Sequence, residues 1–347
     1  MNLAALNTGP DFHLLDHIAP LAHLLNMPLF VEEEKNFTLS SHYYPMIKQS
    51  HIPDIEYQLR FFADTFDTLF ECKYWAPHLK QLFLDLYKKE MRLVFCSHGQ
   101  SDKGYASPLL RHFATQEYCL IYGRLLKDML SELNVSTQLI FTGNYRLFFY
   151  QKNKAFYDAL AEKEVLSRFP TKQQTLIYAP TWKDSDASTS FFTHASALCS
   201  HFPDHWNLIV KIHPLLEERD PAQYYRISHL IEQKPNRLLI SDFIPIYPLL
   251  SASSAYLGDY SSVGYDFLHF ERPMFFLLDP RLPKGRLHAC GTILNTPADL
   301  FSEMEKNKDF SQKQRELYAY AFHVNHCAEA KQKESPSHLD YRRKVAH

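Results

Sequence analysis

Short apolar runs recur along the chain at the spacing expected of buried strands. Each run holds four to nine residues, and neighbouring runs are separated by longer, partly polar segments. Near-continuous apolar runs of this kind are typical of parallel strands that are covered on both faces. In the first half of the chain they occupy residues 28–31, 66–74, 92–97, 117–122 and 138–142. In the second half they occupy residues 175–179, 207–212, 237–240, 255–258 and 273–278.

The segments between these runs carry apolar residues at helical spacing. They predict helices at residues 11–27, 80–91, 124–133 and 146–168, and again at 191–201, 222–232, 246–252 and 262–270. Strands that alternate with helices indicate an α/β protein in which helices cover parallel sheets.

One interruption divides this alternation into two blocks. The segment 170–174 (PTKQQ) is polar, and the strand–helix pattern starts again directly after it. We therefore expect two doubly wound domains that face a cleft, over residues 1–170 and 171–310. Residues 311–347 then form a C-terminal helix and a polar tail.

Composition and charge restrict the class of protein. The chain has 347 residues, of which 46% are apolar and 22% charged, so it is not disordered. With a net charge of −2, the chain has no overall positive charge to attract a phosphate backbone, so we expect no nucleic-acid partner. With 9 glycines, the chain has neither G-x-G-x-x-G nor the P-loop motif, so any phosphate must be held in another way.

The cysteines and the N-terminus indicate the cellular compartment in which we expect the protein. The 6 cysteines are scattered singly, and Cys72 and Cys96 lie in apolar runs, where we expect small buried side chains. The N-terminus lacks the pattern of a signal peptide, and no apolar stretch reaches the roughly 18 residues needed to span a bilayer. These features favour a cytoplasmic protein. Peripheral contact with the inner face of the cell membrane stays open.

Polar residues cluster where four of the predicted strands end, which is where doubly wound sheets bind ligands. The clusters are residues 98–103, 180–183, 211–214 and 259–262. Each has a simpler explanation as well. His98-Gly99 is compatible with a plain turn, Thr181 and Asp259 with helix caps, and Trp182 with a packed ring.

Two of these clusters suit an anion. Ser261 and Ser262 begin a predicted helix, whose N-terminal N–H groups bind phosphate without a glycine-rich loop. Lys211 and His213 flank Ile212 in an extended segment, so both side chains point to the same side.

Taken together, the motifs resemble those of the CDP-glycerol glycerophosphotransferases, which build teichoic-acid-like polyol-phosphate polymers. The resemblance rests on A-P-T-W-K at 179–183, K-I-H-P at 211–214 and D-Y-S-S-V-x-x-D-F at 259–267, preceded by H-G-x-x-x-K at 98–103. The turn at 142–146 (TGNYR) resembles one that these proteins carry before the second domain.

The resemblance implies a GT-B architecture of two Rossmann-like domains, with the nucleotide on the C-terminal one. It implies metal-independent transfer of a polyol phosphate, most simply glycerol phosphate, from a CDP-activated donor, with release of CMP and no cofactor. The acceptor would be the hydroxyl of a polyol phosphate or a glycolipid. His98 would be the general base and His213 a phosphate-binding or acid residue. The donor-binding set would comprise Lys103, Thr181, Trp182, Lys183, Lys211, Asp259, Ser261, Ser262 and Asp266.

The chain also departs from the family pattern. Gln100, Ser101 and Asp102 replace residues that are more often small or proline, and Asp102 would place a carboxylate beside the anion path. The first ninety residues, where we expect the acceptor-binding surface, match no motif.

A second constellation lies near the N-terminus. His13 and His17 are one helical turn apart, a spacing compatible with a metal site. Leu14 stands where a metalloprotease motif has glutamate, which excludes that class. The simpler interpretation is a polar helix face.

Two other functions fit the same fold. One is a glycosyltransferase that uses a nucleotide sugar, and the other is a nucleotide-binding relative without turnover. Fold does not decide among them.

Overall fold

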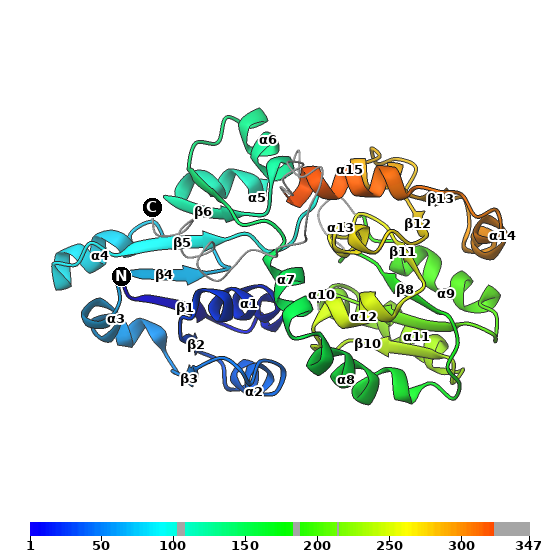
Figure 1. Ribbon diagram of the computed structural model, residues 1–347, viewed down its shortest axis with the longest axis horizontal. Helices are drawn as coiled ribbons and strands as arrows, with labels where there is room; N and C mark the ends of the chain where they lie inside the picture. The colour runs from blue at the N-terminus through cyan, green and yellow to red at the C-terminus, as the bar shows by residue number, and fades with distance from the viewer. Residues whose placement is uncertain (103–107, 183–187, 214, 323–347) are drawn as a thin grey trace, which may run out of the picture. The chain divides into compact units, whose positions relative to one another are not determined.

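A computed structural model describes residues 1–102, 108–182, 188–213 and 215–322. It contains two sheets, of seven and six strands (Figure 1). The chain divides into two compact units. Unit 1 consists of Met1–Gln100, Gly104–Lys152 and Tyr320–His347, and unit 2 of Ser101–Lys103 and Asn153–Ala319.

All pairings in the sheet of unit 1 are parallel. Its strand order is β3-β2-β1-β4-β5-β6-β7. The strands are β1 (Leu3–Asn7), β2 (Leu29–Val31), β3 (Gln49–His51), β4 (Thr68–Glu71), β5 (Arg92–Cys96), β6 (Tyr118–Ile121) and β7 (Gln138–Phe141). The chain winds from β1 to β3, returns beside β1 and continues to β7. The direction of winding therefore reverses between β1 and β4, as in a doubly wound fold.

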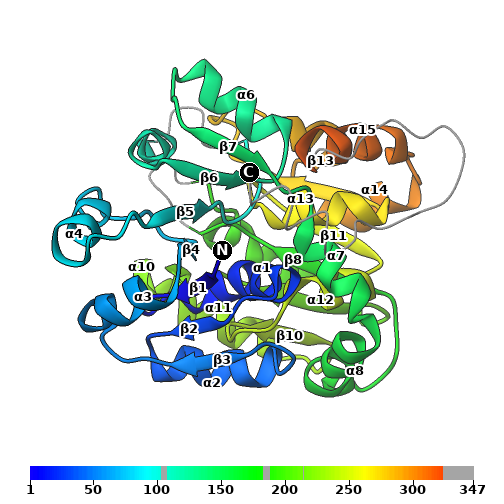
Figure 2. The same cartoon turned by 60° about the vertical axis from the view of Figure 1, so that its left-hand side comes forward.

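Helices surround this sheet. They are η1 (Phe12–Leu14), α1 (Leu15–Leu25), α2 (Glu34–Tyr43), η2 (Ile55–Gln58), α3 (Leu59–Thr65), α4 (Leu79–Tyr87), α5 (Pro108–Arg111), η3 (His112–Thr115), α6 (Arg124–Glu132) and α7 (Tyr145–Lys152). Helix α1 packs on α7 (Figure 2), and α3 packs on α4. The core includes Phe62, Phe83 and Phe95, which are almost completely buried.

The sheet of unit 2 is also wholly parallel, with the order β10-β9-β8-β11-β12-β13. Its strands are β8 (Thr175–Ala179), β9 (Asn207–Lys211), β10 (Arg237–Ile240), β11 (Ala255–Gly258), β12 (Met274–Leu277) and β13 (Thr292–Leu294). Here the winding reverses between β8 and β11. The carboxyl ends of these two neighbours are therefore the expected place for a ligand.

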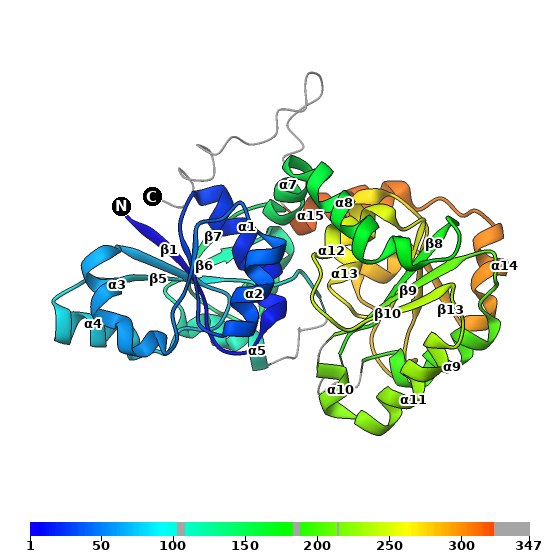
Figure 3. The same ribbon diagram turned by 90° about the horizontal axis from the view of Figure 1, so that it is seen from below.

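Helices cover both faces of this second sheet (Figure 3). Helices α9 (Phe191–His201), α10 (Leu215–Arg219) and α11 (Pro221–Glu232) lie on one face, and α8 (Lys154–Glu164), α12 (Ile246–Ala252) and α13 (Val263–Phe267) on the other. The remaining elements are η4 (Leu166–Arg168), η5 (Leu268–Phe270), η6 (Arg286–Cys290), η7 (Pro297–Asp299), α14 (Leu300–Glu305) and α15 (Ser311–Phe322).

Most of the expected elements are present, and several have the predicted limits. Helices α9 and α12 and strands β8, β10 and β11 begin and end where the apolar pattern places them. The expected doubly wound α/β fold is therefore confirmed.

Other limits differ from prediction, for local reasons. The helix expected at 80–91 ends at Tyr87, because Lys88 adopts a left-handed conformation with φ of 54°. The helix expected at 146–168 is two helices, α7 and α8, and the change between units falls between them. That change, at Lys152–Asn153, precedes the segment 170–174, which the sequence indicates as the linker.

No helix in the described part of the chain is long and apolar enough to cross a membrane. The expected burial of Cys72 and Cys96 is confirmed, and both are free thiols.

Candidate functional site

Asp259 joins the carboxyl ends of β8 and β11, the strands between which the winding of unit 2 reverses. Its Oδ1 accepts the backbone N–H of Thr181 at 2.8 Å. Its Oδ2 accepts the backbone N–H and the hydroxyl of Ser190, both at 2.7 Å. Ser190 is the N-cap residue of α9. Both oxygens of this completely buried carboxylate are thus bonded within unit 2, and they fix the segments around the ligand position.

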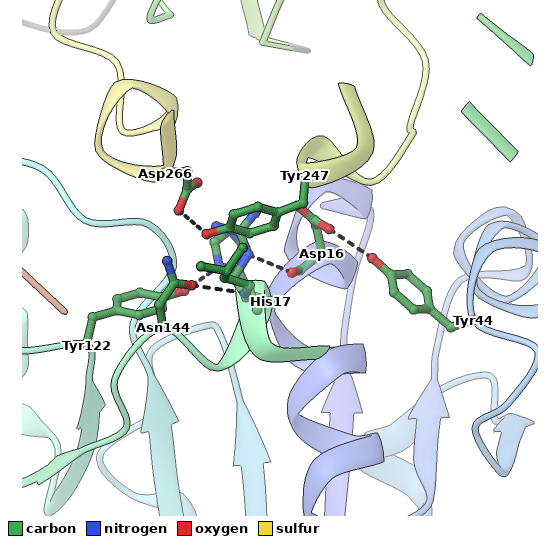
Figure 4. A network of polar contacts seen from close by, with 9 residues as sticks. Asp16, His17, Tyr44, Tyr122, Asn144, Tyr247 and Asp266 are labelled. Atoms are coloured by element: carbon green, nitrogen blue, oxygen red, sulfur yellow. Dashed lines mark hydrogen bonds and ion pairs between the residues drawn. The ribbon is translucent and has the colours of Figure 1, made fainter. Parts of the chain in front are cut away.

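The serine pair that follows β11 begins a helix shorter than predicted. Helix α13 has 5 residues and continues as η5, whereas the sequence indicates one helix over 262–270. Ser261 is buried, and its hydroxyl accepts the N–H of Val263 at 3.4 Å. Asp266, on the same helix, is buried and accepts the hydroxyl of Tyr247 at 2.7 Å (Figure 4).

Lys211 places its ammonium group at the ends of β9 and β10. Its Nζ donates to the carbonyl oxygens of Asp242 at 3.2 Å and Ile212 at 3.4 Å. The cation is thereby held at the ligand edge of the sheet, where ligands of doubly wound folds bind.

The hydrogen bond that His213 accepts determines which ring nitrogen carries its proton. The backbone N–H of Leu215 donates to His213 Nδ1 over 3.2 Å. A backbone N–H only donates, so Nδ1 must offer its lone pair. The proton of the neutral ring is then on Nε2. His213 is consequently arranged to donate a hydrogen bond to an anion.

An aromatic and a cationic side chain accompany His213. The ring centroids of Trp182 and His213 are 6.0 Å apart. The guanidinium of Arg219, on α10, lies 5.5 Å from the centre of the Trp182 ring. Sequence reasoning selected Trp182 but not Arg219, because Arg219 follows no strand and lies in a short helix.

His288 is a further residue that sequence reasoning missed. Its Nδ1 accepts the N–H of Gly285 at 2.9 Å, and its Nε2 lies 3.1 Å from the carbonyl oxygen of Asp259. Burial lowers its pKa, so the ring is neutral and donates from Nε2. It anchors the loop after β11. No strand end or motif marks it in the sequence.

His98 follows β5 in unit 1 and has the opposite arrangement to His213. Its Nδ1 lies 3.1 Å from the carbonyl oxygen of Cys72. A carbonyl only accepts, so Nδ1 must carry the proton and Nε2 the lone pair. Part of the side chain is exposed, yet the surrounding protein desolvates the ring and lowers its pKa. Neutral His98 can therefore accept a proton at Nε2.

The two N-terminal histidines lie beside His98. Its ring centroid is 6.5 Å from that of His13 and 6.3 Å from that of His17. His17 Nδ1 and the hydroxyl of Tyr122 are 2.8 Å apart (Figure 4). Burial, with the charge of Arg146 as the next cause, keeps the pKa of His17 well below its ordinary value.

The turn at 142–146 closes against α1. Arg146 Nε donates to the carbonyl oxygen of Asp16 at 2.9 Å, and its guanidinium forms an ion pair with the Asp16 carboxylate. Tyr44 also donates to that carboxylate, at 3.0 Å (Figure 4). This network fixes the helix that carries His17.

The carboxylate of Asp102 lies beside the short helix η6. Its carboxylate accepts the N–H of Arg286, the first residue of η6, and lies against Gly285. The side chain is buried within unit 2. The Asp102 carboxylate thus bonds the first N–H group of this short helix, and its position relative to a bound anion stays a prediction.

Two predicted residues, Lys103 and Lys183, lie outside the described residues. Over the described ranges there is no group of three or more His, Cys, Asp and Glu side chains that could hold a metal ion.

Comparison with known proteins identifies the family. Residues 148–328, just over half of the chain, match the family described as CDP-Glycerol:Poly(glycerophosphate) glycerophosphotransferase. The chain belongs to this family of enzymes. The resemblance drawn from the motifs is therefore confirmed.

Two curated relatives of the glycerophosphotransferase family come from Bacillus spizizenii. A teichoic acid glycerol-phosphate primase is 27% identical over 126 residues, which cover 35% of this chain and 30% of the primase. A teichoic acid poly(glycerol phosphate) polymerase is 26% identical over 185 residues, which cover 48% of this chain and 43% of the polymerase. This glycerophosphotransferase-family chain thus matches less than half the length of either relative.

Solved structures support the fold of the glycerophosphotransferase-family chain. A variant of the wall teichoic acid polymerase TagF has a TM-score of 0.62 at 13% identity, covering 93% of this chain and 84% of that one. The UDP-GlcNAc 2-epimerase of Neisseria meningitidis has a TM-score of 0.58 at 13% identity, covering 90% and 93%. At these identities the likeness concerns the fold alone.

Proposed function

We propose that the protein transfers glycerol phosphate from CDP-glycerol to an acceptor hydroxyl and releases CMP, in the synthesis of a teichoic-acid-like surface polymer. Membership of the family and the names of its relatives support the reaction class. The observation that carries the proposal is the opposite proton placement of two histidines at strand ends. His98 offers a lone pair at Nε2, and His213 offers an N–H at Nε2.

Unit 2 is the proposed donor domain. The diphosphate is bound by Lys211, by the Nε2–H of His213, and by the hydroxyl and N–H groups at Ser261 and Ser262. Trp182 flanks His213 and adds a ring against which the donor packs. Asp259 and Asp266 are positioning residues, because their oxygens are bonded to protein groups. Thr181, Lys103 and Lys183 complete the donor set by resemblance to the family.

Unit 1 is the proposed acceptor domain and supplies the base. The acceptor hydroxyl oxygen forms a bond to the β-phosphorus of CDP-glycerol, and the bond from that phosphorus to the CMP oxygen breaks. The hydroxyl proton moves to Nε2 of His98. The leaving CMP gains negative charge, which Lys211 and His213 stabilise. Phosphoryl transfer needs mainly positioning and neutralisation of charge, and we propose that this chain supplies both without a metal ion.

The proposed acceptor is the terminal hydroxyl of a polyol phosphate or a glycolipid. Such acceptors are carried on membranes, so we propose a cytoplasmic protein with peripheral contact at the inner face of the cell membrane.

Ligand-dependent melting distinguishes this proposal from a glycosyltransferase. CDP-glycerol at 100 times its Kd should stabilise the protein by about 2.7 kcal/mol, because a ligand that binds only the folded state adds RT ln(1 + [L]/Kd). CDP-glycerol and CMP should raise the Tm, whereas UDP-sugars should not. His213→Ala should reduce the shift, and His201→Ala, at an exposed histidine of the same unit, should not. Stabilisation by UDP-sugars alone would favour the glycosyltransferase.

A further inference from the structure

Gln100 has a buried side-chain amide for which the described residues provide no hydrogen-bond partner. It follows β5 by four residues and His98 by two, after Gly99, whose φ is 80°. Its side chain is 2% exposed. Among the described residues it is the one side chain for which two buried polar atoms, Nε2 and Oε1, both lack a partner.

A second buried glutamine in unit 1 shows what a satisfied amide looks like in this fold. Gln116 is 4% exposed, and its Oε1 accepts the N–H of Trp75 at 2.9 Å. Its Nε2 donates to the carbonyl oxygen of Trp75 at 3.2 Å and to the hydroxyl of Thr115 at 2.8 Å. Burying an amide without such bonds costs about 1–3 kcal/mol, so an orphaned one indicates a missing partner.

The amide itself restricts the chemistry of that partner. Nε2 has two hydrogens to donate, and Oε1 needs a donor. A phosphate diester only accepts hydrogen bonds, so it would leave Oε1 unpaired. A hydroxyl group both donates and accepts, so it can satisfy both atoms. Gln100 therefore fits an alcohol better than an anion.

We propose that Gln100 binds the secondary hydroxyl of the acceptor's terminal glycerol unit. This inference rests on the proposed function, in which the attacking hydroxyl of the acceptor gives its proton to His98, and it takes that hydroxyl to be the primary one of the same glycerol unit. The two hydroxyls are on adjacent carbons of glycerol, and the two side chains are two residues apart in one loop. Gln100 takes part in no covalent step and selects acceptors that carry a vicinal diol.

An acceptor pair tests this directly. The first acceptor is an alkyl phosphate ester of glycerol with a free vicinal diol, and the second is the matching ester of propane-1,3-diol, which lacks the secondary hydroxyl. Release of CMP from CDP-glycerol is measured with both acceptors for wild type, Gln100→Met and Gln100→Glu. Wild type should prefer the diol in kcat/KM by about 10- to 100-fold, the size of one hydrogen-bonded hydroxyl.

Gln100→Met should lose most of that preference by raising the KM of the diol, while the KM of CDP-glycerol and the Tm stay near wild type. Gln100→Glu keeps the size of the side chain and should also lose preference, because it no longer has an N–H to donate. Gln116→Met is the matched control, and it should lower the Tm yet retain the preference.

The outcomes separate the two proposals. If wild type shows no CDP-glycerol-dependent transfer, the proposed function fails and this inference with it. If transfer occurs but Gln100→Met keeps the full diol preference, the inference is wrong and the proposed function stands.

Discussion

At the scale of single residues, His98 and His213 both carry an imidazole ring, but their Nδ1 atoms contact different backbone groups. A carbonyl at His98 fixes the proton on Nδ1, and an N–H at His213 fixes it on Nε2. Since neutral imidazole carries one proton, these contacts decide which residue can accept and which can donate. The proposed roles of the two histidines therefore depend on two backbone groups, the carbonyl of Cys72 and the N–H of Leu215.

The pKa of His98 leads to a prediction about pH. Desolvation lowers that pKa below its ordinary 6.5, and the contact with Cys72 and the charge of Asp11 oppose this only in part. The base is active when neutral, so kcat/KM should fall as pH decreases, with a midpoint below 6.5. The pH–rate profile measures this. His98→Ala should abolish this acid limb, whereas His201→Ala should keep it. A limb centred above 6.5 would contradict the assignment.

Glu71, at the end of β4, is a buried carboxyl group that the sequence did not single out. Burial raises its pKa from about 4.5 to about 7, although the Thr8 hydroxyl and Lys73 oppose the change. The side chain is 5% exposed. The folded state therefore favours the protonated form. This contribution to stability is complete below pH 4.5 and is lost as pH rises through 7.

Glu71→Gln should remove this dependence. Glutamine resembles the protonated acid and has no charge to bury, so the variant should melt at higher temperature than wild type at pH 8 and equally at pH 4.5. The difference between the two pKa values corresponds to about 3 kcal/mol. Melting curves across pH test it, with Glu90→Gln at an exposed position as control. If the variant melts below wild type at pH 8, burial of the ionised Glu71 carboxylate does not destabilise the folded state.

At the scale of elements, Asp259 couples β8, β11 and the start of α9. Asp259→Asn should destabilise unit 2 by about 1–3 kcal/mol, because an NH2 group would face a buried N–H donor. It should also weaken the affinity for CDP-glycerol, since Thr181 loses its anchor. Urea unfolding and donor titration measure both. Asp204→Asn, which breaks an exposed ion pair with Lys234, should change neither. Wild-type donor affinity in Asp259→Asn would show that the anchor is not needed.

Elements that are buried on all sides could be predicted from the sequence. The runs at β8 and β11 are wholly buried, and the apolar pattern gives their limits. By contrast, β1 (LAALN) lies in the interior of its sheet, between β2 and β4, yet was not predicted, because alanine and asparagine favour strands weakly. Edge strand β3 (QSH) is partly exposed and carries no apolar signal. Its existence depends on pairing with β2.

Strand ends and motifs mark the candidate residues in each unit, and their functional roles stay predictions. Strand ends marked His98, Lys211 and Asp259, because a doubly wound sheet gathers ligand-binding residues there. His288 and Arg219 were not predicted, since only tertiary contacts place them beside Asp259 and Trp182. The hydrogen bond from the N–H of Arg286 to the Asp102 carboxylate was not predicted either. Sequence spacing does not report such long-range pairing.

At the scale of the whole molecule, the family match covers much more of unit 2 than of unit 1. Residues 148–328 include nearly all of unit 2, the proposed donor domain, whereas most of unit 1 lies before the match. The family match therefore bears mainly on the proposed donor domain. We propose that unit 1 selects the acceptor, and there His98 and Gln100 have testable roles.

The most direct test of the proposed function is CMP release from CDP-glycerol, measured at steady state in EDTA with the vicinal-diol acceptor. Wild type should turn over in the chelator. His98→Ala should lower kcat by about 10²–10⁴-fold with little change in the donor Kd, as expected for loss of a general base. His213→Ala should weaken donor binding as well as turnover. Near wild-type turnover by His98→Ala, or activity that returns only when Mg²⁺ or Mn²⁺ is added, would contradict the proposed mechanism.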